Sequence, residues 1–195
     1  HSIEEPVIEG DRFIIRRTKN GDTGMLQNQV LLPEAGNAQI EKVGGKGKEF
    51  WVFGTNYPND ALPNRPDDAN ERGAWRVEVS PAVPAAENYF LNVMQVADNT
   101  CKRMNDVKRI DAGKVVGVQI ADRIVTFSKN SLPLSGKIDM KVDGNTSMKF
   151  VITDLIPGTW QIKKDGKVYI PAVEVRSDDG ILSFEGTAGH YEFLR

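Results

Sequence analysis

The stretch "WQIKKDGKVYI", residues 160–170, has the pattern of a β-hairpin. Side chains alternate between the two faces of a β-strand, so Trp160 and Ile162 share one face of the first arm. The Asp165–Gly166 pair favours the positive φ angles of a tight two-residue turn. The stretch therefore predicts two antiparallel strands with Trp160 and Ile162 directed into a core.

The same alternation and the same turn chemistry recur along the chain. Both "WRVEV" (residues 75–79) and "IDMKV" (residues 138–142) alternate apolar with polar side chains, and turn signals such as "NGDTG" at 20–24 follow one another closely. Short strands with closely spaced turns predict an all-β fold, an antiparallel β-sandwich of two packed β units. The stretch "YFLNVMQVA" (residues 89–97) is apolar on both faces except at Asn92 and Gln95. We therefore expect it to be a central strand covered on both sides.

Helical periodicity is confined to "CKRMNDVKRI", residues 101–110, where Met104, Val107 and Ile110 recur every three positions. This spacing is typical of a short helix or a crossover. A charged and polar segment ends there, and a fresh set of strands begins near Val115. We therefore predict a first β unit at 1–105, a junction at 106–112 and a small C-terminal β domain at 113–195.

Composition excludes several classes of protein. The 195 residues carry 25 Lys and Arg against 27 Asp and Glu, a net charge of −2 that disfavours nucleic acid as a partner. The apolar runs are too short for a membrane span. A single cysteine, Cys101, cannot form an internal disulfide. No charged and apolar leader precedes "HSIEEP", so we expect a processed or truncated start.

Residues that commonly perform catalysis are scarce. The two histidines are His1 and His190, and a triad needs one of them beside a nucleophile and an acid. His190 shares a strand face with Glu192, which favours a surface histidine. Cys101 has no second cysteine or nearby histidine in sequence, which favours a structural thiol. The glycine-rich "GGKGK" lacks the Ser or Thr of a phosphate loop and predicts a turn. We predict no catalytic residue.

Aromatic side chains are the remaining candidates for binding. In "EFWVF" (residues 49–53) an aromatic face must meet a second layer, a partner domain or a sugar ring. Residues 54–74 have no strand or helix pattern and exceed the usual length of a loop in a compact domain, which is typical of binding or disordered segments. The candidate substrate-binding residues are Trp51, Tyr57, Arg65 and Arg72.

The order of several phrases carries a resemblance to a known family. The chain opens with "HSIEEPVIEGDRF", continues with "LLPEAGNAQIEKVGGKGKEFWVFGTNYP" and "GAWRVEVSPAVPAAENYFLNVMQVAD", and ends with "DLIPGTWQIKKDG" and "GILSFEGTAGHYEFLR". In this order they resemble the heparinase II/III-like polysaccharide lyases over nearly all of the chain. The resemblance implies the late central β-sandwich, residues 1–105, followed by the small C-terminal β domain.

The resemblance also implies that this chain is part of a larger bacterial enzyme, periplasmic or secreted, in which catalysis and support belong to different domains. Family members cleave uronic-acid-containing polysaccharides, glycosaminoglycans among them, by β-elimination. A base removes the proton at C5 and an acid protonates the leaving oxygen. Most of these groups come from an N-terminal toroid, which the sequence lacks. This chain would then be inactive alone, support the toroid and frame one end of the polysaccharide cleft.

A structural zinc is a further expectation from the resemblance. Some members bind zinc through a histidine just ahead of an "EEP"-like stretch, where His1 lies, although a terminal histidine without a metal explains His1 equally well. Its partner ligands would lie upstream, and one histidine cannot hold zinc tightly. Two other functions stay open for the chain as a whole, a stand-alone carbohydrate-binding module and a structural or adhesion β-sandwich domain.

Overall fold

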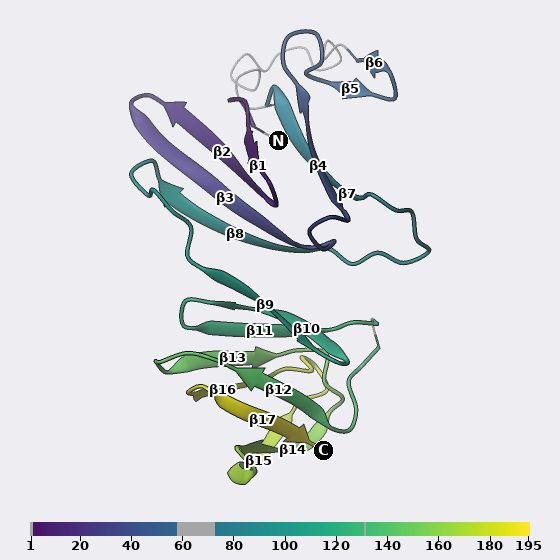
Figure 1. The fold of residues 1–195 in the computed structure, drawn as a ribbon, viewed down its shortest axis with the longest axis vertical. Helices are drawn as coiled ribbons and strands as arrows, with labels where there is room; N and C mark the ends of the chain where they lie inside the picture. The colour runs from purple at the N-terminus through teal and green to yellow at the C-terminus, as the bar shows by residue number, and fades with distance from the viewer. Residues whose placement is uncertain (1, 58–72, 131) are drawn as a thin grey trace. The chain divides into compact units, whose positions relative to one another are not determined.

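The computed structural model describes residues 2–57, 73–130 and 132–195. The described residues form strands and turns without a helix, which confirms the predicted all-β class (Figure 1). Two compact units divide the chain, His1–Met104 and Asn105–Arg195. Each unit is considered by itself below.

The first unit contains a four-stranded sheet, a two-stranded pair and a small hairpin. The sheet has the order β1-β2-β3-β8 and is antiparallel throughout, β4 pairs with β7, and β5 pairs with β6. The strands are β1 (Val7–Glu9), β2 (Arg12–Lys19), β3 (Asp22–Leu32), β4 (Ala38–Gly44), β5 (Trp51–Val52), β6 (Thr55–Asn56), β7 (Trp75–Pro81) and β8 (Leu91–Asp98).

Strand β3, in the interior of this sheet, buries three consecutive polar side chains, Gln27, Asn28 and Gln29. A buried amide is tolerated where it finds hydrogen-bond partners. The Gln29 amide donates to the Asp11 carboxylate at 3.0 Å, and the Asn28 amide donates to the Asn92 side-chain oxygen at 3.2 Å. Side-chain hydrogen bonds therefore accompany the backbone ladder across this sheet.

The expectation for residues 89–97 is wrong. The strand begins at Leu91, lies at the edge of its sheet and, among the described strands, pairs with β3 alone. Met94 and Val96 are 64% and 82% exposed. Apolar residues on both faces do not require a central position in a sheet, because an edge strand can also present them to a surface that another chain covers.

The second unit consists of two larger sheets. Their orders are β16-β13-β11-β10-β9 and β12-β17-β14-β15, antiparallel except for the parallel pair β11–β13. The strands are β9 (Val107–Ala112), β10 (Val115–Ile120), β11 (Arg123–Ser128), β12 (Ile138–Val142), β13 (Met148–Ile152), β14 (Gly158–Lys164), β15 (Lys167–Val175), β16 (Leu182–Gly186) and β17 (Gly189–Leu194).

Both sheets of the second unit contribute to one hydrophobic core. Trp160 and Ile162 of β14 are fully buried in the same cluster as Phe150 of β13. The indole N–H of Trp160 donates to the Ile156 carbonyl at 3.0 Å, so its polar atom is satisfied. The hairpin predicted from residues 160–170 is confirmed: β14 and β15 are antiparallel and joined through Asp165 and Gly166, both at positive φ.

The expectation of a short helix or crossover within residues 101–110 is also wrong. Residues Val107–Ala112 form strand β9, which pairs along its whole length with β10. Ile110 is buried in the core of the second unit. Residues three apart lie on one face of a helix but on alternate faces of a strand. Three apolar residues at this spacing are too few to distinguish the two structures.

Candidate functional site

The β5–β6 hairpin is held by its own polar groups. The carboxylate of Glu49 accepts the Gly47 backbone N–H at 3.0 Å and the Asn56 amide at 3.4 Å. The Asn56 side-chain oxygen in turn accepts the Phe50 N–H at 2.8 Å. Hydrogen bonds from its own backbone N–H and from Gly47 lower the pKa of Glu49, so this carboxylate is charged at neutral pH.

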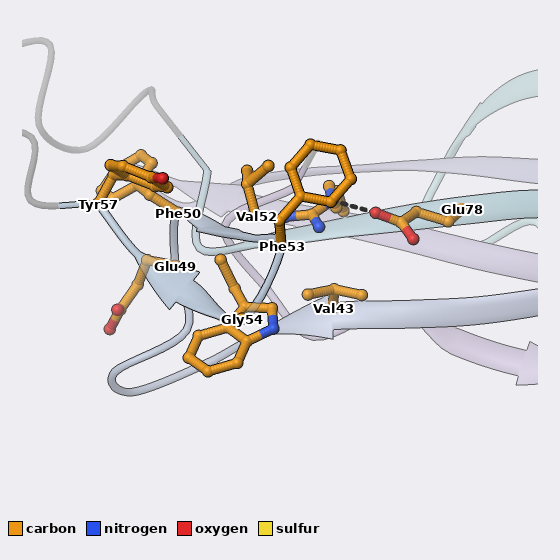
Figure 2. A pocket seen from close by; sticks show the side chains of 10 residues that line it. Val43, Glu49, Phe50, Val52, Phe53, Gly54, Tyr57 and Glu78 are labelled. Atoms are coloured by element: carbon orange, nitrogen blue, oxygen red, sulfur yellow. Dashed lines mark hydrogen bonds and ion pairs between the residues drawn. The ribbon is translucent and has the colours of Figure 1, made fainter.

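A hollow of about 990 Å³ lies over this hairpin and the neighbouring end of the β4–β7 pair (Figure 2). Its wall is mainly apolar and aromatic, with a few charged groups, as is usual for small-molecule sites. The residues that line it are Val43, Glu49, Phe50, Trp51, Val52, Phe53, Gly54, Tyr57, Arg76 and Glu78.

Two of the four predicted substrate-binding residues meet in this hollow. Trp51 is half-buried, and the Lys48 ammonium lies 5.4 Å from the centre of its ring. Tyr57 is 56% exposed, and its backbone N–H donates to the Phe50 carbonyl at 3.3 Å. Arg65 and Arg72 lie outside the described residues. Substrate binding by all four stays a prediction.

The hollow also contains residues outside the four predicted substrate-binding residues. Phe53, at the tip of the hairpin, is 100% exposed. Arg76 and Glu78 project from one face of β7, where the Arg76 Nε donates to the Glu78 Oε1 at 2.5 Å. Val43 is the cross-strand partner of Arg76 on β4. Only the β4–β7 pairing brings residues 43 and 76 together, and no local pattern in the sequence indicates it.

Elsewhere, the described imidazole lies on the surface of the second unit. His190 is on β17, where its Nε2 pairs with the carboxylate of Asp139 on β12. Lys137 lies 3.0 Å from the other oxygen of Asp139 and also pairs with Glu192. These are partly exposed ion pairs across neighbouring strands, which fits the predicted surface histidine.

The single cysteine lies among polar partners in the first unit. Cys101 is half-buried, its sulfur accepts the side-chain amides of Gln27 and Gln95 at 3.6 Å, and its thiol donates to the Arg103 carbonyl at 3.3 Å. These contacts join the sheet to the segment that follows β8. The predicted structural role of the thiol is consistent with this position.

The zinc implied by the resemblance does not find a ligand set in the described part of the chain. Within residues 2–57, 73–130 and 132–195, no group of three or more His, Cys, Asp or Glu could hold a metal ion. His1 lies outside the described residues. The zinc therefore stays an expectation, and no role is assigned to it here.

Comparison with known proteins finds a family match for most of the second unit. Residues 109–195 match the family described as the heparinase II C-terminal domain. The resemblance to the heparinase II/III-like lyases is thereby confirmed for this part of the chain. The matched segment begins within β9 and includes every later strand. A heparinase C-terminal domain implies a catalytic domain in the parent protein.

No curated protein matches the chain. Among the described residues, none belongs to a helix with the length and apolar character needed to cross a bilayer.

Proposed function

We propose that this chain is the non-catalytic C-terminal β portion of a heparinase II/III-like polysaccharide lyase and supports the catalytic toroid of that enzyme. The match of residues 109–195 to the heparinase II C-terminal domain carries the proposal. The parent enzyme cleaves a uronic-acid-containing polysaccharide by β-elimination, in the periplasm or outside the cell. The groups that move the protons belong to the rest of the enzyme.

The first unit offers a surface suited to this support. In the register of the sheet, Val96 of β8 pairs with Leu26 of β3, which pairs with Ile15 of β2. Paired residues share a face in an antiparallel sheet, so these three form an apolar strip. Met94 lies next along β8 on the same face. The strip joins three strands without a charged side chain at these positions.

Burial changes sharply along this face. Val30, on the same face of β3, is 2% exposed, whereas Val96 is 82% exposed and Met94 64% exposed. Exposed apolar side chains that form a patch commonly mark an interaction surface. We assign this face, defined by Ile15, Leu26, Met94 and Val96, to contact with the catalytic portion of the same lyase, and call it the docking face.

An assay of β-elimination tests the non-catalytic part of the proposal. The purified 195-residue chain is incubated with heparan sulfate, chondroitin sulfate or alginate, and the unsaturated uronate is followed by its ultraviolet absorbance. We expect no product above the level of buffer. Turnover that rises in proportion to the protein would overturn the proposal, and loss of that turnover in His190→Ala would locate an active site within the chain.

A further inference from the structure

The tip of the β5–β6 hairpin has an unusual residue in its turn. Phe53 and Gly54 are the two central residues, with φ of 47° and 85°. Two-residue hairpins with positive φ at both positions favour Asn-Gly or Asp-Gly, because a bulky side chain is strained in the left-handed region. Such strain costs on the order of 1 kcal/mol or more and is concentrated at functional sites.

Folding stability does not account for this phenylalanine. Its side chain is 100% exposed, so it gains nothing from burial in the described structure. Figure 2 shows the side chains of Phe53 and Val52 rising from the hairpin in the same direction, with Tyr57 and Phe50 at the other end of the hollow. A strained turn thus presents an aromatic ring at the rim of a concave, mainly apolar surface.

Polar groups suited to hydroxyl recognition lie on the same hollow. The Arg76 Nε is bonded to Glu78, and a guanidinium carries further N–H donors besides this one. Arg76 therefore retains donors, and the half-exposed Glu78 carboxylate retains acceptor capacity. A paired donor and acceptor beside aromatic rings can bind neighbouring hydroxyl groups while a ring packs against an apolar face.

The charged groups around the hollow bear on whether it binds charged or uncharged sugars. Among the described residues, its lining contains the carboxylates of Glu49 and Glu78 and the guanidinium of Arg76, and the Lys48 ammonium lies over the Trp51 ring. These charges balance, since the pKa of Glu49 is lowered and its carboxylate remains charged. Without a surplus of positive charge among the described residues, the hollow offers no net attraction to sulfate or carboxylate groups, so an uncharged ring suits it better than a densely charged polysaccharide segment.

We propose that this hollow binds an uncharged pyranose ring of a glycan chain. The ring packs its apolar face against Phe53, and its hydroxyl groups bond to the Arg76–Glu78 pair, while Tyr57 at the other end of the hollow is placed for a neighbouring unit of the same glycan. This site would bind uncharged sugar units, whereas cleavage takes place at the uronate. It goes beyond the proposed function, because it needs no contact with the catalytic portion.

Isothermal titration calorimetry of the whole chain with uncharged hexasaccharides tests the site. The probes are cellohexaose and chitohexaose, with a heparin hexasaccharide as the charged comparison. We expect at least one uncharged probe to bind and the heparin fragment to bind more weakly or not at all. The absence of binding by both uncharged probes, or tighter binding of heparin, would overturn the proposal.

Substitutions locate the binding. Phe53→Ala should weaken the uncharged ligand about tenfold, equivalent to about 1.4 kcal/mol. Phe90→Ala is the matched control, because Phe90 is 52% exposed and does not line the hollow. Arg76→Met keeps the aliphatic stem and should also weaken binding. Equal losses in Phe53→Ala and Phe90→Ala, or unchanged binding in Phe53→Ala with its circular dichroism intact, would contradict the site.

The two proposals fail independently. Loss of glycan binding leaves the lyase-support proposal in place, because that proposal rests on the family match and on the lack of turnover by the chain alone. Conversely, turnover by the chain would leave the calorimetric result unaffected.

Discussion

The two units of this protein differ in how completely each encloses a core. In the second unit, two sheets share one cluster that contains Trp160, Phe150, Tyr191 and Phe193, all fully buried. Among the described residues of the first unit, the hydrophobic side chains buried to a comparable degree are Met25, Val30 and Met104. The second unit is thus a closed sandwich, whereas the first leaves the apolar side chains of Met94 and Val96 exposed among the described residues.

This difference indicates where each unit obtains its stability. Burial of apolar surface is the main favourable term in folding, and the second unit achieves it internally. The first unit buries the polar side chains of Gln27, Asn28 and Gln29, of which Asn28 and Gln29 donate to Asn92 and Asp11, and leaves Met94 and Val96 exposed. An incomplete core of this kind suits a unit that is stabilised by a neighbouring domain, as the proposed function requires.

The largest contrast is expected between two tryptophans. Trp160→Ala should destabilise the second unit by about 3–5 kcal/mol, because it empties a fully buried site and removes the hydrogen bond to Ile156. Trp75→Ala should cost less, since Trp75 is half-buried in the first unit. Urea denaturation with hydrogen exchange of peptides from each unit measures both losses. Equal losses of stability in the two variants would contradict the difference in core packing between the units.

Two glycines in strands give a smaller contrast. A Cβ at Gly117 of β10 would lie 2.2 Å from the Val125 carbonyl oxygen, so Gly117→Ala must push two backbones apart and should cost about 1–3 kcal/mol. A Cβ at Gly24 of β3 would meet nothing closer than the Ala97 carbonyl oxygen at 3.9 Å. Gly24→Ala should therefore change stability by less than about 0.5 kcal/mol. Thermal unfolding of both variants checks this, and an equally large loss in Gly24→Ala would show that the first unit is packed as closely as the second.

The smallest effect concerns the surface ion pairs of the second unit. Hydrogen bonds from His190 and then Lys137 lower the pKa of Asp139. A carboxyl with a depressed folded-state pKa stabilises the fold above its unfolded value of 3.8, and this contribution is lost as the pH falls through the folded value. Asp139→Asn should thus be slightly less stable than the wild type near neutral pH.

The pH profile provides the control for this variant. The difference between Asp139→Asn and the wild type should narrow below about pH 4, where the wild-type carboxyl also takes up its proton. It should stay small throughout, since the Asp139 side chain is 48% exposed and solvent screens the pair. Urea midpoints of the two proteins, measured across the acid range, give this difference in stability. A difference that widens in acid would contradict the lowered pKa of Asp139.

Local patterns predicted much of the fold. The Asp165–Gly166 turn and the inward faces of Trp160 and Ile162 follow from alternation and turn chemistry, and both are observed. Sheet order does not follow from such patterns. The edge position of β8 depends on which strands pair across the chain, and so does the parallel pairing of β11 with β13. Short apolar spacings also misassigned β9, because three residues fit more than one period.

The candidate site was accessible to sequence reasoning only in part. Trp51 and Tyr57 stand out as aromatic residues in and beside a glycine-rich stretch, and both line the hollow. Phe53 belongs to the aromatic stretch that the sequence indicated, but its place in a tight turn before Gly54 was not predicted. Arg76 and Glu78 could not be found from the sequence, because they reach the hollow through strand pairing between residues far apart in the chain.

Oxidation of Met94 tests the docking face most directly. Met94 is 64% exposed, whereas Met25 on the opposite face of the same sheet is 6% exposed and serves as the internal reference. The chain alone and the chain bound to the catalytic portion of its lyase are treated with peroxide, and methionine sulfoxide is quantified by mass spectrometry. The account predicts fast oxidation of Met94 in the chain alone and a rate approaching that of Met25 in the complex. An unchanged Met94 rate in a complex that has formed would contradict it.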